Sequence, residues 1–206
     1  MTNPPNLTIV PLTPDRFADL AELFEQGGDP KWCWCSYFRV RGRDWTNASP
    51  TENRGALLAL AERDRRDHPA PGLVAYRGTR AVGWVSLGPR EDYERLAYSK
   101  ILAPLDEAPV WSIVCFVVSS RARGQGVAAS LLDAAIAYAR DRGATLLEGY
   151  PVDAGEGRVP AANAFHGTLS MFERAGFTVV ARRQWNASTP VRPIVRLTLA
   201  HEHTRR

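Results

Sequence analysis

The amino-acid sequence predicts an α/β (α+β) fold built on a mixed sheet with helices on both faces. Two strand-like runs, 72–77 and 80–87, are separated only by Gly78-Thr79, which predicts an antiparallel hairpin. An apolar run at 110–118 is followed by a helical pattern and then by another strand-like run at 145–150. Such a β-α-β unit gives two parallel strands with the helix packed on the sheet. A sheet that holds both units is mixed.

The totals are those of an ordinary globular protein. The chain has 206 residues, of which 45% are apolar and 23% charged. No apolar run is long enough to span a membrane, the N-terminus lacks the pattern of a secretory signal, and three cysteines suggest no disulfide framework. The net charge of +4 is spread along the chain and does not form a basic patch. We therefore expect a cytoplasmic protein that binds neither membranes nor nucleic acids.

The first half of the chain is predicted to contain a strand, two helices and the hairpin. The strand covers 7–12, and a helix with apolar residues at near-helical spacing covers 14–24 and ends at Gly27-Gly28. Ser49-Pro50-Thr51-Glu52 predicts the start of the second helix, because Ser at the N-cap and Glu at N3 form a capping box and Pro suits N1. Residues 90–105 are polar and are expected to be irregular.

The second half continues from the strand at 110–118. The next helix carries an apolar stripe and ends before Gly143, a glycine that suits a helix C-terminus. A strand at 145–150, a loop at 151–161, a helix at 162–175 and strands at 177–184 and 191–199 follow, and a loose tail is expected from about 201. The predicted order is β-α-α-β-β-β-α-β-α-β-β.

The turn between the central strand and its helix is a candidate phosphate site. Gly124-Gln125-Gly126 lets the backbone approach an anion closely. The free N–H groups and the dipole of the helix that follows favour negative charge there. Arg121 and Arg123 add positive charge.

Two nucleotide-binding patterns fit this turn. Residues 124–129 satisfy the dinucleotide pattern G-x-G-x-x-A, and Glu148 lies where a ribose-binding acid is expected. Against this interpretation, residues 119–123 separate the strand from the first glycine, and the chain has only about one β-α-β unit. The second pattern, R/Q-x-x-G-x-G/A, is matched at every fixed position by residues 121–126. Through these residues the chain resembles the GNAT superfamily of acetyl-CoA-dependent N-acetyltransferases.

The resemblance extends over most of the chain. The predicted element order is similar to the GNAT fold, and residues 172–177 (FERAGF) look like the second signature of that family. The resemblance implies a mostly antiparallel sheet with one splayed parallel pair, and a single N-acetyltransferase domain over 1–206. It also implies acetyl-CoA as the donor and no metal.

For the donor, the resemblance implies that the pantetheine arm lies along the central strand and that the glycine turn holds the pyrophosphate. A backbone N–H near Phe116 is then expected to polarise the thioester carbonyl. The acceptor amine attacks directly, without a covalent enzyme intermediate. The residues that the resemblance assigns to CoA binding are Phe116, Val117, Val118, Arg123, Gly124, Gln125, Gly126, Val127, Ala128 and Phe172.

The chain departs from the family pattern at the general acid. Many members have a tyrosine where this chain has Phe172, which carries no proton to donate. Tyr150 is the leading alternative acid and His166 another, although a CoA thiolate can also leave without one. Glu148 is the leading candidate base, ahead of Asp153. Strand alternation places Glu148 and Tyr150 on the same face.

The acceptor is expected to contact the aromatic segment at 32–38 and residues after the hairpin. Within these regions Trp34, Tyr37, Trp84 and Arg90 are the candidate contacts, and Arg90 is suited to a carboxylate. Packing of the aromatic segment beneath a mobile lid is the alternative. A zinc site at Cys33 and Cys35 is disfavoured because no histidine pair completes four ligands. Cys115 is expected to be a buried structural thiol.

These observations predict an acetyl-CoA-dependent N-acetyltransferase that acts on a primary amine of a small molecule, with a peptide or protein amine as the second choice. A non-catalytic acyl-CoA-binding domain is the alternative, motivated by Phe172. A dinucleotide-binding domain comes third. Homodimer formation is left open.

Overall fold

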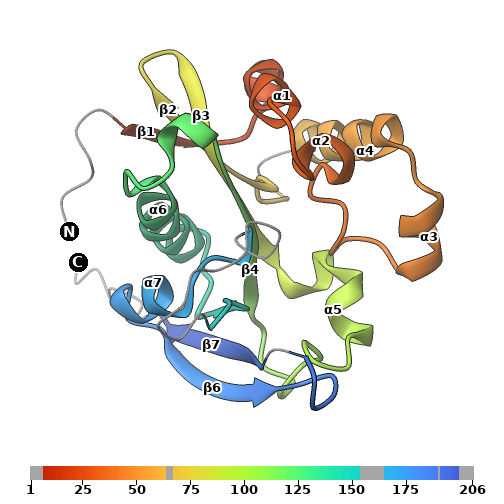
Figure 1. Cartoon of the computed structure of the whole chain (residues 1–206). Coiled ribbons are helices and arrows are strands. Elements are labelled where there is room, and N and C mark those ends of the chain that lie inside the picture. The colour runs from red at the N-terminus through yellow and green to blue at the C-terminus, as the bar shows by residue number, and fades with distance from the viewer. Residues whose placement is uncertain (1–6, 64–66, 154–164, 190, 200–206) are drawn as a thin grey trace.

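The computed structural model describes residues 7–63, 67–153, 165–189 and 191–199, which form one seven-stranded sheet in the order β1-β2-β3-β4-β5-β7-β6 (Figure 1). Only β4 and β5 are parallel among the described pairs, so the predicted mixed, mostly antiparallel sheet is confirmed. The strands are β1 (Leu7–Pro11), β2 (Gly72–Arg77), β3 (Arg80–Pro89), β4 (Trp111–Val118), β5 (Leu146–Gly149), β6 (Thr178–Arg183) and β7 (Arg192–Thr198).

Each predicted strand is present, and no end differs by more than two residues from the predicted end. Each of the predicted helices is also present, as α1 (Phe17–Glu25), α4 (Pro50–Glu62), α6 (Val127–Asp141) and α7 (Leu169–Arg174). A short 3-10 turn, η1 (Pro14–Arg16), precedes α1. The capping box of α4 is formed: the Glu52 N–H donates to Ser49 Oγ at 3.2 Å, and the Ser49 N–H donates to Glu52 Oε2 at 2.7 Å.

Helix α7 begins later than predicted. Thr168 caps it by accepting a hydrogen bond from the Met171 N–H, so the first helical residue is Leu169 and not residue 162. Residues 162–164, most of the predicted loop at 151–161 and the predicted loose tail lie outside the described residues.

Three short helices were not predicted: α2 (Pro30–Cys33), α3 (Gly42–Asn47) and α5 (Glu94–Tyr98). They are too short for apolar residues to show a helical period, and tertiary contacts hold them. The Arg95 N–H of α5, for example, donates to the Phe38 carbonyl at 3.1 Å. The expectation that residues 90–105 are irregular is therefore wrong, since this segment also contains the 3-10 turn η2 (Arg90–Asp92).

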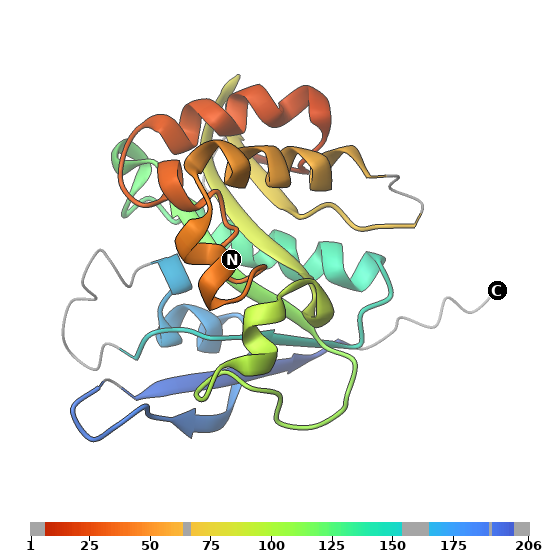
Figure 2. The same ribbon diagram turned by 90° about the vertical axis from the view of Figure 1, so that its right-hand side faces the viewer.

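The helices divide between the two faces of the sheet. Helices α6 and α7 cover one face, and α1 to α5 lie over the other (Figures 1 and 2). The two apolar clusters follow this division, with Ile113 and Phe116 of β4 packed on the α6 side and Val114 and Cys115 packed on the other. Strand β4 therefore contributes to both cores and passes through the middle of the molecule.

Candidate functional site

Strands β4 and β5 separate after a short parallel ladder. They pair at Trp111↔Leu147, Ser112↔Glu148 and Ile113↔Gly149, and no described strand pairs with this edge of β4 beyond Ile113. The Ser119 N–H donates to the Val82 carbonyl on β3 at 3.0 Å. Because peptide groups alternate in direction along a strand, those of Phe116 and Val118 point away from β3, towards the open edge. That edge can pair with an extended ligand.

A β-bulge lies where the two strands separate. The register between β3 and β4 shifts from Ser86↔Cys115 to Leu87↔Ile113, which leaves Val114 as an extra residue. The bulge explains why Val114 and Cys115 are consecutive and yet pack on the same face. It also bends β4 beside the departure of β5.

The loop after β4 exposes its backbone at the start of α6. Residues 123–126 are exposed, and Gly124 (φ 73°) and Gly126 (φ 78°) adopt the left-handed conformation that favours glycine. No side chain caps α6, so its first N–H groups remain available to an anion. Gln125 accepts a hydrogen bond from Arg77 Nη1 at 2.7 Å and donates one to the Arg121 carbonyl at 2.8 Å, which fixes the loop.

The surroundings of this loop are basic. A cavity of about 390 Å³ beside it is lined by the arginines Arg77, Arg80 and Arg121, together with Gln26, Val82, Ser119, Ser120 and Ala122. Arg123 Nε donates to the Val118 carbonyl at 3.3 Å and therefore lies between the loop and the open edge of β4. The predicted CoA-binding residues of 116–118 and 123–128 thus lie together along one continuous stretch of backbone.

Phe172 fills the gap between the separating strands on the α6 side. Its ring is fully buried, with its centroid 6.1 Å from that of Phe116 and 5.0 Å from that of Phe177. A Cβ atom at Gly149 would lie 2.4 Å from this ring, so β5 needs glycine at that position. Phe172 is a packing residue here and offers no proton.

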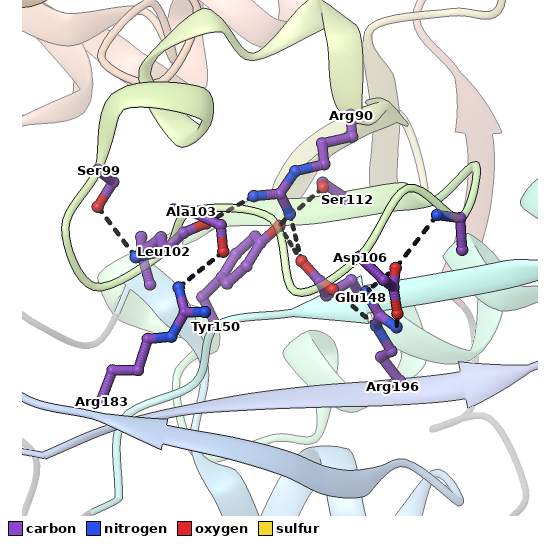
Figure 3. Close-up of polar contacts among 11 residues, drawn as sticks. Arg90, Ser99, Leu102, Ala103, Asp106, Ser112, Glu148, Tyr150, Arg183 and Arg196 are labelled. Carbon is purple, nitrogen blue, oxygen red and sulfur yellow. Dashed lines mark hydrogen bonds and ion pairs between the residues drawn. The ribbon is translucent and has the colours of Figure 1, made fainter.

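On the opposite face, Glu148 is fully buried in a network of polar side chains (Figure 3). Its Oε1 accepts hydrogen bonds from the Tyr150 hydroxyl, at 2.8 Å, and from Arg90 Nη1. Its Oε2 accepts from Arg196 Nε at 2.8 Å. The contact between Glu148 and Tyr150 confirms that they share one face of the chain. Two arginines compensate the buried carboxylate, which would otherwise be costly.

The network also connects residues 102–106, which follow α5, to the sheet through hydrogen bonds. Arg90 also donates to the Tyr150 oxygen at 2.6 Å and to the Leu102 carbonyl at 2.5 Å. Arg196 donates to both oxygens of Asp106, at 2.6 and 3.0 Å. Figure 3 shows Leu102 beside Arg90 and Asp106 beside Arg196, and it shows the Ala103 carbonyl accepting a hydrogen bond from Arg183 of β6.

Tyr150 is held as a protonated phenol. Its single proton is donated to Glu148, so the Ser112 hydroxyl, 2.9 Å away, donates to the Tyr150 oxygen. Burial raises the pKa of Tyr150 well above its usual value, and the charge of Glu148 raises it further. Ser112, Tyr150 and Glu148 therefore form a hydrogen-bonded chain beside the point where β4 and β5 separate.

The structure separates the residues that were predicted to contact the acceptor. Tyr37 is partly exposed and lines a cavity. Trp34 packs in the core, with its ring centroid 6.0 Å from that of Phe17. Trp84 is also buried and donates to Cys35 Sγ at 3.2 Å. The guanidinium of Arg90 lies in the Glu148 network and not in this cavity.

The cavity that Tyr37 lines has a volume of about 230 Å³ and lies between α5, the start of β7 and the residues before α7. Sequence analysis missed Arg95 and Arg192 as residues of this cavity, because they come from a short helix and a strand end with no motif around them. His166 lines it too. The lining residues are Tyr37, Phe38, Arg95, Leu96, Ser99, Leu102, Phe165, His166 and Arg192.

Two further features concern possible ligands and membranes. In the described part of the chain, no cluster of three or more His, Cys, Asp or Glu side chains is arranged to hold a metal ion. Among the described helices, none is both long and apolar enough to cross a membrane. Cys115 is buried, as predicted, and its hydrogen bond with Cys35, together with burial, raises the pKa of its thiol.

Comparison with solved structures shows the same fold in proteins of low identity. A putative acetyltransferase, yncA of Salmonella typhimurium, solved with its cofactor acetyl-CoA, has a TM-score of 0.54 and 16% identity, with 97% of this chain and 96% of that chain covered. An agmatine N-acetyltransferase has a TM-score of 0.58 and 12% identity, with 94% and 100% covered. The NatC complex bound to Gag peptide and CoA has a TM-score of 0.53 and 14% identity, with 95% and 99% covered.

A comparison with curated proteins finds no significant match. The family model described as "Acetyltransferase (GNAT) family" matches residues 33–167, which is well over half of the chain and includes β4, the glycine loop, Glu148 and Tyr150. The resemblance seen in the sequence is thereby confirmed, as is the prediction of an acyltransferase, and the dinucleotide-binding alternative is set aside. The protein belongs to the acetyltransferase (GNAT) family.

Proposed function

We propose that this protein transfers the acetyl group of acetyl-CoA to a primary amine of a small molecule, by direct attack of the amine on the thioester. The observation that carries the proposal is the open edge of β4 leading into the glycine loop. The peptide groups of Phe116 and Val118 point towards this edge, and the exposed residues 123–126 and the uncapped start of α6 follow it. One extended ligand with a peptide-like arm and a pyrophosphate suits both features.

The N–H of Phe116 is the group that we propose polarises the thioester carbonyl. It lies on the open edge just beyond the bulge at Val114, where β5 no longer pairs with β4. A fixed donor aimed at an oxygen that gains negative charge lowers the barrier to attack by the amine.

For proton transfer, we propose that Glu148 receives the proton of the attacking ammonium through the hydroxyl of Tyr150. Both side chains are buried, and both Glu148 oxygens already accept hydrogen bonds from the protein, which argues against direct contact between Glu148 and the acceptor. The Tyr150 oxygen accepts hydrogen bonds from Ser112 of β4 and from Arg90, so it takes the ammonium proton in place of the hydrogen bond from Ser112 while its own proton passes to Glu148. Arg90 and Arg196 are positioning residues that hold Glu148.

The small size of the acceptor is supported by the cavity of about 230 Å³, which is below the range of roughly 300–1,000 Å³ typical of drug-sized ligands. Among the structural neighbours, one is named for a small amine and another is bound to a peptide. A peptide amine is therefore the second choice.

The test is turnover of acetyl-CoA with a panel of small primary amines and short peptides. Release of the CoA thiol and the mass of the acetylated product are measured together. We expect acetylation of small amines with a higher kcat/KM than that of peptides. Acetylation of peptides alone would overturn the choice of a small acceptor.

Gly126→Ala and Gly143→Ala form a matched pair for the donor site. Both glycines have left-handed φ angles, 78° and 80°, at opposite ends of α6, so an added Cβ strains each by about 1–2 kcal/mol. We expect Gly126→Ala to lower kcat/KM for acetyl-CoA and Gly143→Ala to leave it unchanged. If both substitutions lower kcat/KM equally, backbone strain at the ends of α6, and not the loss of loop contacts to CoA, explains the decrease.

A second candidate, non-catalytic acyl-CoA binding, is favoured by Phe172, which leaves the usual tyrosine position without a proton. Tight binding of CoA with no thiol release on any amine would select it.

A further inference from the structure

Three buried nitrogen atoms without hydrogen-bond partners belong to residues of one cavity. Arg95 Nη2, His166 Nδ1 and Arg192 Nη1 have no partner among the described residues. All three residues line the cavity of about 230 Å³ that Tyr37 also lines. An unpaired buried polar group is costly, and such groups are few in native proteins. Their gathering around one cavity makes this cavity the candidate site for a ligand with hydrogen-bond acceptors.

The charge of the cavity specifies the kind of ligand. Its lining includes two guanidinium groups and no carboxylate, and neither Arg95 nor Arg192 forms an ion pair with a described acidic residue. Arg95 is held by a hydrogen bond from its Nε to the Tyr37 carbonyl at 2.6 Å and lies over the Tyr37 ring. Its Nη2 therefore stays free for an anion. Burial lowers the pKa of Arg192, as expected for a cation that lacks a counter-charge.

His166 adds a fixed neutral donor. Its ring lies 3.9 Å from that of Phe165 and 5.7 Å from that of Phe38, centroid to centroid, and its side chain is more than nine-tenths buried. Burial, assisted by the charge of Arg192, lowers its pKa to about 3. The imidazole is therefore neutral at physiological pH, and its Nδ1 can carry the hydrogen that a nearby oxyanion accepts.

We propose that this cavity binds the carboxylate of the acceptor, and that the acceptor is a free amino acid or a closely related amino carboxylic acid. The inference rests on the proposed N-acetyltransferase activity. Guanidinium groups bind carboxylates through paired hydrogen bonds, and the cavity is small enough to favour a small molecule. The cavity also adjoins the Glu148 network, because Leu102 lines it while its carbonyl accepts a hydrogen bond from Arg90.

The first test compares α-amino acids with their own amides, which keep the amine and lose the carboxylate charge. We expect kcat/KM for the preferred amino acid to exceed that for its amide by about tenfold or more, the range of one charge-assisted hydrogen bond. Equal values for acid and amide would overturn the proposal.

The second test uses Arg192→Gln, with Arg182→Gln as the matched control. Arg182 lies on the neighbouring strand β6, is paired with Asp153 and does not line the cavity. We expect Arg192→Gln to raise KM for the amino acid about tenfold while the rate with the amide changes less than twofold, and Arg182→Gln to change neither. A parallel loss with acid and amide would show that Arg192 is only structural and would overturn its assignment.

The third test needs no turnover, so it separates this proposal from the proposed function. Calorimetry measures binding of amino acids, of their N-acetyl derivatives and of aminoalkyl phosphonates to the full chain in the presence of CoA. We expect an amino acid or its N-acetyl derivative to bind, and Arg192→Gln to weaken that binding about tenfold. Binding of none of these carboxylates, or of the phosphonates alone, would overturn the carboxylate assignment, even in an active enzyme.

Discussion

The donor side and the acceptor side of this protein are built in different ways. The donor side is one continuous stretch, β4 followed by the glycine loop and α6, and its candidate contacts are mostly backbone groups. The acceptor side brings together side chains from β5, β7, α5 and the segments around residues 37, 102 and 166. The first is fixed by local geometry. The second depends on buried charge and on the packing of distant segments.

This contrast predicts how substitutions will act. Changes on the acceptor side are expected to affect the stability of the fold together with turnover, because the same side chains hold the segments in place. Changes to the exposed side chains of the glycine loop are expected to affect CoA binding more than stability, because residues 123–126 lie outside the core.

Glu148→Gln is expected to have the largest effect. It leaves Arg90 and Arg196 without their buried counter-charge, and removing one partner of a buried ion pair costs about 3–5 kcal/mol. Chemical denaturation measures the loss. We also expect turnover at neutral pH to fall by about 100-fold, the lower end of general-base contributions, and higher pH to restore part of it by deprotonating the amine in solution.

Asp106→Asn is the control for Glu148→Gln. It removes the negative charge of Asp106, the half-exposed partner of Arg196, and leaves Glu148 in place. We expect its cost in stability to stay within the 0–1 kcal/mol of a surface pair. If Glu148→Gln leaves turnover at neutral pH untouched, Glu148 does not receive the proton.

His166→Phe tests the acceptor side through pH. The folded-state pKa of His166 is lowered to about 3 from 6.5, so between these values the unfolded chain binds a proton that the folded protein does not. His166 therefore makes the wild-type protein lose stability as pH falls through this window, by up to about 1.4 kcal/mol per pH unit. Phenylalanine keeps the ring packing and cannot titrate.

The measurement is the difference in the free energy of unfolding between wild type and His166→Phe at pH 7, 6 and 5. We expect the difference to shift in favour of the variant as pH falls. Parallel curves over this range would contradict a buried neutral histidine.

Gly149→Ala tests the packing of Phe172 against β5, at the place where β5 separates from β4. The new Cβ would lie 2.4 Å from the Phe172 ring, and overpacking of this kind costs about 1–3 kcal/mol. Phe172→Leu in the same chain makes room, so a double-mutant cycle should show that the two substitutions couple. If the losses of stability from Gly149→Ala and Phe172→Leu simply add, the Phe172 ring is not in tight contact with residue 149 of β5.

The same contrast explains how much of the molecule was predictable from sequence. The seven strands, the capping box of α4 and the glycine after the end of α6 follow from neighbouring residues, and these predictions of secondary structure agree with the structure. The bulge at Val114 arises from pairing with β3, so no local pattern reveals it.

The acceptor side was less predictable because its residues meet only in three dimensions. Trp34 and Trp84 have the aromatic character of pocket residues, yet they lie in the core, where Trp34 reaches its position through a left-handed backbone (φ 43°). Arg95 and Arg192 are nearly a hundred residues apart and carry no motif. Strand alternation predicted that Glu148 and Tyr150 share a face. It did not predict that Arg90 and Arg196 bind Glu148, because both arginines come from other strands or turns.

Arg123→Ala is expected to have the smallest and most selective effect. Arg123 is exposed, and within the described part of the chain its side chain donates one hydrogen bond, from Nε to the Val118 carbonyl. Its loss should therefore change the free energy of unfolding by no more than about 0.5 kcal/mol. Loss of one contact to the CoA phosphates should weaken CoA binding about tenfold, and the loss should shrink at high salt. Calorimetry at two salt concentrations, beside denaturation of the same variant, separates the two quantities. An unchanged dissociation constant for CoA would argue against binding of the pyrophosphate at this loop. A large loss of stability would contradict the difference drawn above, in which the donor side uses backbone groups and the acceptor side uses buried charged side chains.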